Sequence, residues 1–203
     1  MPTEQINTFM LSLPEGWHEI DLDPDAVAEV LAEHAPESDD EEVQRAFRRQ
    51  VLVARRIVAQ VQQGGVTWAA AMGETHEEGG EVFGLTCLAY LAVQSAADVG
   101  ADQLTFEQLR EAASAELPVG QDRLQQPQLV DLTAGPALRD RILHRDTSSE
   151  EVETHSLDVR YHVLVGSGDG FAVLGFITPN VELADELGEL FEAIAQTLEF
   201  VAV

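Results

Sequence analysis

The stretch LDVRYHVLVGSGDGFAVLGFIT, residues 157–178, indicates the fold most clearly. In its first half, apolar residues occupy every second position from Leu157 to Val165, and mostly polar residues lie between them. This period of two is typical of a β-strand that packs one face against a core. Three glycines fall within residues 166–170, and an apolar run follows at 171–178. We therefore predict an antiparallel hairpin between residues 157–165 and 171–178.

Other stretches predict further strands. Residues 66–73 and 82–94 are apolar runs on either side of the acidic stretch 74–81, so we expect a second antiparallel hairpin with its turn there. Residues 128–133 and 137–146 should be strands around Gly135 and Pro136. Near the start of the chain, short strands are expected on both sides of a Pro-Glu-Gly turn, the second at residues 17–22.

Four segments have helical patterns. Residues 38–63 carry apolar side chains at steps of three and four, with four acidic residues in the first turn, where the helix dipole favours them. Thr105 and Gln108 have the spacing of a capping box, which predicts a helix over 105–117. Less extensive sequence patterns predict two further helices, at 26–34 and 181–198. Together with the hairpins, these helices predict an α+β fold with an antiparallel β-sheet flanked by helices.

The two ends of the chain resemble the Mog1/PsbP-like family in its bacterial members. The resemblance lies in FMLSLPEGW at residues 9–17, in YHVLV at 161–165, and in the glycine turn, apolar strand and acidic helix that follow. It implies an antiparallel sheet between helices, an α/β/α sandwich. It also implies a protein that binds other molecules without catalysing a reaction. The long helix at 38–63 departs from the family pattern.

The charge balance limits the classes of partner. The chain has 203 residues with 45% hydrophobic residues, which fits one globular domain over residues 1–203. Its net charge is −26, and all eleven bases are arginine, as expected of a high-GC bacterial gene. A surface with this much negative charge repels nucleic acid and anionic membranes. We therefore expect neither as a partner. Another protein, basic in character, is the expected partner.

The location of the protein is predicted from what the sequence lacks. Residues 1–13 have neither the basic start nor the apolar run of a secretory signal. No window reaches the roughly 20 apolar residues that a membrane helix needs. The one cysteine, Cys87, can form no internal disulfide and is expected to pack in the core. The expected location is the cytoplasm.

Arginines cluster on the predicted helix 38–63, where five of the eleven occur. Arg45, Arg48, Arg49 and Arg56 are the candidate residues for contact with a partner. They could bind an acidic or phosphorylated segment. The alternative, which we favour from the sequence, is that they pair with the protein's own carboxylates.

No motif predicts a metal, a cofactor or a catalytic residue. His76 lies among Glu74, Glu77 and Glu78, but a glycine-bearing turn gives such a set little rigidity, so we expect no metal site. The acidic run at 38–42 lacks the ligand spacing of a calcium loop. The glycines of 166–170 join two strands with no helix beside them, which favours a turn over a phosphate loop.

The function expected from these observations is non-catalytic protein binding, as an adaptor, chaperone or accessory subunit. Two alternatives stay open. One is a small hydrolase whose active-site residues are dispersed in the sequence. The other is an acidic decoy that mimics nucleic acid.

Overall fold

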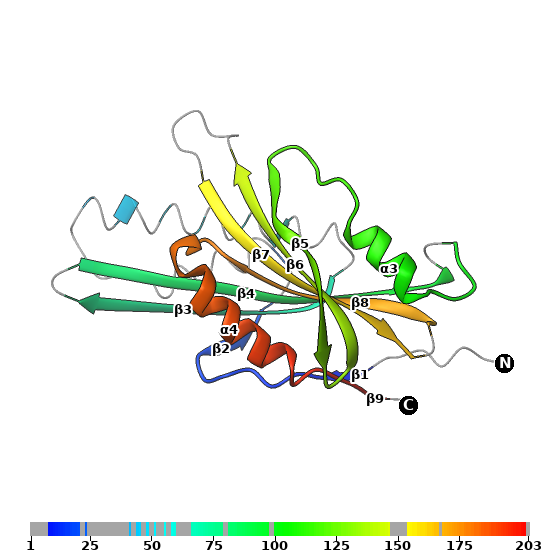
Figure 1. Ribbon diagram of the computed structural model, residues 1–203. Helices are drawn as coiled ribbons and strands as arrows, with labels where there is room; N and C mark the ends of the chain where they lie inside the picture. Colours follow the sequence, from blue (N-terminus) through cyan, green and yellow to red (C-terminus); the bar gives the residue numbers. More distant parts are fainter. Residues whose placement is uncertain are drawn as a thin grey trace.

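The fold is seen in a computed structural model (Figure 1). It describes residues 8–20, 23, 41, 44, 45, 48, 51, 55, 58, 59, 66–78, 81–97, 100–146, 154–166 and 168–201.

A seven-stranded antiparallel sheet is the centre of the molecule (Figure 1). Its strands, in spatial order, are β2 (Trp17–Glu19), β3 (Val66–Glu78), β4 (Glu81–Ser95), β8 (Gly170–Thr178), β7 (Thr154–Val165), β6 (Gly135–Asp146) and β5 (Gln121–Leu132). Both predicted hairpins are confirmed, because β3 pairs antiparallel with β4 and β7 with β8. A separate two-stranded ribbon joins β1 (Thr8–Met10) to β9 (Glu199–Val201).

One face of the sheet packs on helix α4 (Ala184–Ala195), which lies across it in Figure 1. The apolar residues of 157–165 that alternate in the sequence point to this face and are almost fully buried. The ring of Phe176 on β8 stacks on that of Phe191 on α4, with centroids 4.7 Å apart. Burial of these side chains is the main force that holds α4 on the sheet.

The opposite face of the sheet packs on helix α3 (Phe106–Ala113), which contacts β6 and β7. Leu109 and Ala113 form a cluster with Leu138 of β6. The predicted capping box is present, since Gln108 and Thr105 each bond the backbone N–H of the other. The described chain is thus an α+β fold built on an antiparallel sheet.

Several predicted boundaries were wrong. Helix α3 ends at Ala113 and not at residue 117, and β5 begins at Gln121 and not at residue 128. The acidic stretch 74–81 is mostly strand, because β3 continues to Glu78 and β4 starts at Glu81. The predicted helix 181–198 consists of a 3-10 turn (Val181–Leu183) followed by α4, which already ends at Ala195. The acidic stretch and the start of β5 are strand because backbone pairing with the neighbouring strand continues through them and overrides local preference.

The predicted helix 38–63 is described only in part, and each of its described residues is helical. Val58 is buried, whereas Arg45 and Arg48 are exposed, as the predicted amphipathic pattern requires. Arg49 and Arg56 lie outside the described residues, as does the predicted helix 26–34. The side chains of the Glu74–Glu78 group, His76 included, also lie outside the described part.

Candidate functional site

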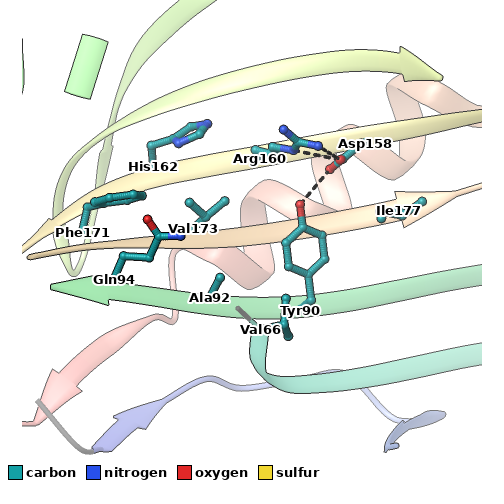
Figure 2. A pocket seen from close by; sticks show the side chains of 10 residues that line it. All are labelled: Val66, Tyr90, Ala92, Gln94, Asp158, Arg160, His162, Phe171, Val173 and Ile177. Carbon is teal, nitrogen blue, oxygen red and sulfur yellow. Dashed lines mark hydrogen bonds and ion pairs between the residues drawn. The ribbon is translucent and has the colours of Figure 1, made fainter. Parts of the chain in front are cut away.

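A cavity of about 210 Å³ lies on the sheet face opposite α4 (Figure 2). Strands β4, β8 and β7 supply nearly all of its lining, with Val66 of β3 at one side. The apolar part of the lining is Val66, Ala92, Phe171, Val173 and Ile177; the polar part is Tyr90, Gln94, Asp158, Arg160 and His162.

Strand register explains why these residues meet. On β7, Asp158, Arg160 and His162 alternate with the buried core residues, so all three point away from α4. Pairing sets Arg160 opposite Gly175 of β8, and Gly175 in turn opposite Tyr90 of β4. Residues from three strands that are distant in the sequence therefore form one row across the sheet.

Asp158 is the centre of a buried polar cluster, with only 1% of its surface exposed. Arg160 donates to its Oδ2 from both Nε, at 2.8 Å, and Nη2, at 2.6 Å. The Tyr90 hydroxyl donates a long hydrogen bond to Oδ1, at 3.4 Å; Figure 2 draws this contact as a dashed line. His144 Nε2 lies 3.4 Å from Oδ2, which is long for a hydrogen bond. The carboxylate is therefore held by protein groups on both oxygens.

These contacts shift the pKa values of the cluster. Burial raises the pKa of Asp158, but the charge of Arg160 and the neighbouring His144 outweigh it, and the pKa lies below its ordinary value. Burial and the charge of Asp158 raise the pKa of Tyr90. The charge of Asp158 raises the pKa of Arg160. At neutral pH the cluster is therefore an ion pair of Asp158 and Arg160, whose charges cancel, beside the neutral phenol of Tyr90.

His162 has a different environment from the other polar groups of the cavity. Its Nε2 is buried and makes no hydrogen bond to any described residue. Burial, with the charge of Arg160 next, lowers the pKa of His162 to about 4, although Asp140 and Asp158 act in the opposite direction. The imidazole is therefore neutral at physiological pH, and its Nε2 has no hydrogen-bond partner among the described residues.

A second buried ion pair lies on the same sheet face. Arg123 of β5 donates from Nε to both oxygens of Asp140, at 3.0 and 3.1 Å. The same guanidinium donates to the carbonyls of Ala113 and Ala115, at 2.6 and 3.2 Å. Arg123 therefore ties the end of α3 to β5 and β6. Its role is structural, because its guanidinium is engaged by Asp140 and by the two carbonyls.

The sequence did not identify the residues of the cavity. Asp158, Arg160 and His162 were seen only as the polar positions of a strand, which usually face solvent. The available signal was the spacing of Asp158 and Arg160, because opposite charges two apart on a strand lie on one face. The strand order that adds Tyr90 could not be read from local sequence.

The predicted partner-binding residues do not line this cavity. Arg45 and Arg48 are exposed on their helix, and Arg49 and Arg56 lie outside the described residues. Within the described part of the chain, no group of three or more His, Cys, Asp or Glu side chains could hold a metal ion. Cys87 is buried in the core, and burial raises the pKa of its thiol to about 11.

Comparison with known protein families, sequences and structures gives a match among the structures alone. No protein-family model and no curated protein sequence matches the chain. Among solved structures, it is similar to LpqN, described as involved in cell envelope biogenesis of Mycobacterium tuberculosis. The identity is 12% and the TM-score 0.49, over 96% of this chain and 83% of LpqN. Among the described residues, no helix is both long and apolar enough to cross a membrane.

Proposed function

We propose that this protein is a non-catalytic accessory protein, an adaptor or chaperone, that binds another protein through strand β5. The observation that carries the proposal is the position of β5 at the end of the sheet, where β6 is its only partner among the described strands. The other side of an edge strand presents backbone N–H and C=O groups to a strand of another chain. On β5, Leu124 and Leu129 are 50% and 64% exposed, which supplies apolar contacts as well.

Features of β5 limit how a partner can pair with it. The register with β6 shifts on both sides of Gln125, and Pro127 lies within the second shift. Proline has no N–H to donate, so a partner strand would pair with the part of β5 before it or after it. With a net charge of −26, the protein attracts a basic partner and repels a second copy of itself.

The alternative as a hydrolase has one observation in its favour, the cavity with Asp158 and His162. However, both oxygens of Asp158 are engaged, by Arg160 and Tyr90, so this carboxylate is not free to act as a base. Among the described residues of its lining, no serine, threonine or cysteine is present to act as a nucleophile. The cavity therefore supports binding more than catalysis, and the exposed leucines of β5 favour protein binding over a purely electrostatic decoy.

The test uses charged substitutions on the edge strand. The native cell extract is passed over the wild-type protein and over Leu124→Lys and Leu129→Lys, with Leu183→Lys as control, since Leu183 is 39% exposed but lies on the 3-10 turn. A partner retained by the wild type and the control, and lost from the β5 variants, supports the proposal. A partner retained by all of them contradicts the β5 site.

Binding kinetics with the purified partner then distinguish electrostatic steering, which acts on association, from the contacts within the complex, which set dissociation. Between low and high salt, the association rate should fall roughly tenfold or more, with little change in dissociation. Equal salt sensitivity of both rates would favour the nucleic-acid decoy. Turnover of a small substrate that a single substitution abolishes would favour the hydrolase.

The finer structural assignments belong to the same proposal. The Mog1/PsbP-like family, the α/β/α sandwich and a single domain over residues 1–203 are supported by the terminal motifs and by helices on both faces of the sheet. The cytoplasmic location rests on the sequence alone. Arg45, Arg48, Arg49 and Arg56 remain a second proposed contact, for an acidic or phosphorylated segment of the partner.

A further inference from the structure

We infer that the cavity between β4, β8 and β7 binds a small uncharged alcohol, whose apolar body packs on the valine and phenylalanine side chains while its hydroxyl bonds His162 Nε2. This site is separate from β5 and does not depend on the proposed protein partner.

The shape of the cavity sets the size of the ligand. Its volume of about 210 Å³ is below the range of roughly 300–1,000 Å³ that is usual for drug-sized ligands. Val66, Gln94 and Phe171 are half-buried, so the cavity is accessible from solvent. A six-membered ring or a short branched chain is therefore the expected apolar body, in contact with Phe171 and Val173.

Charge in the cavity excludes ionic ligands. Arg160 and Asp158 neutralise each other, and His162 is uncharged at neutral pH. A carboxylate would enter against the net charge of −26, and Arg160 already gives two of its donor nitrogens to Asp158. A cation would find both oxygens of Asp158 occupied. An unpaired charge in such a site is costly, so a neutral ligand is preferred.

The available polar groups select a hydroxyl. A buried nitrogen without a hydrogen-bond partner is unfavourable, and a ligand that bonds it removes that cost. His162 Nε2 is such an atom, and Gln94 adds an amide that both donates and accepts. A hydroxyl also does both, so it satisfies either tautomer of His162.

The experiment compares three soluble probes that share one ring: cyclohexanol, cyclohexanecarboxylate and cyclohexylammonium. Each is titrated into the full chain at pH 7.5, and binding is followed by NMR at the amide of Val173 and at the ring nitrogens of His162. We expect cyclohexanol to bind with a dissociation constant on the order of 1 mM, given its few atoms. Both ions should bind at least roughly tenfold more weakly.

Two variants locate the probe. His162→Leu should weaken cyclohexanol roughly tenfold, whereas His155→Leu, at an exposed histidine of the same strand, should have no effect. Ala92→Leu fills the cavity and should abolish binding even if His162→Leu does not fold. The inference is overturned if no probe gives saturable shifts, if either ion binds most tightly, or if His162→Leu and Ala92→Leu both fold and bind cyclohexanol unchanged.

Discussion

The ring of Tyr90 lies in the space that a side chain on Gly175 would occupy. The two residues are opposite each other on β4 and β8, and a Cβ built on Gly175 would overlap three atoms of the phenol. Because glycine leaves that space empty, the ring can cross β8 and bring its hydroxyl to Asp158 on β7. A residue without a side chain thus allows three strands to share one polar cluster.

Gly175→Ala should therefore destabilise the protein. The ring of Tyr90 must move, which loosens its hydrogen bond to Asp158 and the packing around it. We expect a loss of about 1–3 kcal/mol in the free energy of unfolding, measured by urea denaturation. Gly188→Ala is the control, because a Cβ there meets nothing within 4 Å and the residue lies in helix α4. That variant should be more stable by up to about 1 kcal/mol. Equal effects at the two glycines would contradict the crossing of Tyr90 over Gly175.

Asp158→Asn should be among the most destabilising single substitutions in the sheet. It leaves the guanidinium of Arg160, which is largely buried, without its charged partner. Loss of one member of a buried pair usually lowers stability by about 3–5 kcal/mol, and the 26% exposure of Arg160 reduces this to about 2–3 kcal/mol. The matched control is Asp185→Asn, whose carboxylate is 94% exposed in its pair with Arg141 and should change stability by less than about 1 kcal/mol. Thermal or urea unfolding of both variants at pH 7.5 decides the point.

The sequence predicted the hairpins because each consists of two neighbouring apolar runs with a glycine-bearing connection. The alternation of residues 157–165 and the apolar run at 171–178 were enough to predict this hairpin, and the spacing of Thr105 and Gln108 was enough to predict the capping box. Local propensity and tertiary structure agree in these segments.

What the sequence did not predict depends on long-range pairing. Strand β9, which begins just after the predicted helix 181–198, was not predicted, because only its partner β1, at the other end of the chain, makes it a strand. The cavity was missed for a similar reason. Its polar residues on β7 share a sheet face with Tyr90, Val173 and Phe171. These residues meet only because the strands lie in the order β4-β8-β7. Within a short window of sequence, β9 has no signal, and the cavity has only the spacing of Asp158 and Arg160.

Arg123→Met should lower the stability of the protein much more than the same substitution in an exposed ion pair. The variant keeps much of the apolar stem but leaves Asp140, only 2% exposed, without its charged partner, and it removes two bonds to the end of α3. We expect a loss of about 3–5 kcal/mol. Arg145→Met breaks a pair with Asp122 in which both side chains are at least half exposed, and should change stability by about 1 kcal/mol or less. Hydrogen exchange of the α3 amides should rise in the first variant alone; protection that stays unchanged would mean that α3 does not depend on Arg123.

The pH dependence of stability should contain a contribution from His162. Its pKa falls from an ordinary 6.5 to about 4 on folding, because burial and the charge of Arg160 disfavour the imidazolium. Between these values the unfolded chain binds a proton and the folded chain does not, so stability is complete above pH 6.5 and is lost as the pH falls toward 4. For the step from pH 7.5 to pH 5, this is at most about 2 kcal/mol.

Urea unfolding at the two pH values, for the wild type and for His162→Gln, isolates that contribution from the other titrating groups. The difference in unfolding free energy between pH 7.5 and 5 should be smaller in His162→Gln by roughly 1–2 kcal/mol, since glutamine has no charge to gain. A His162→Gln variant that keeps the full wild-type difference would show that His162 can be protonated in the folded state. The buried, neutral imidazole on which the alcohol site depends would then be wrong, whatever the result of the probe titrations.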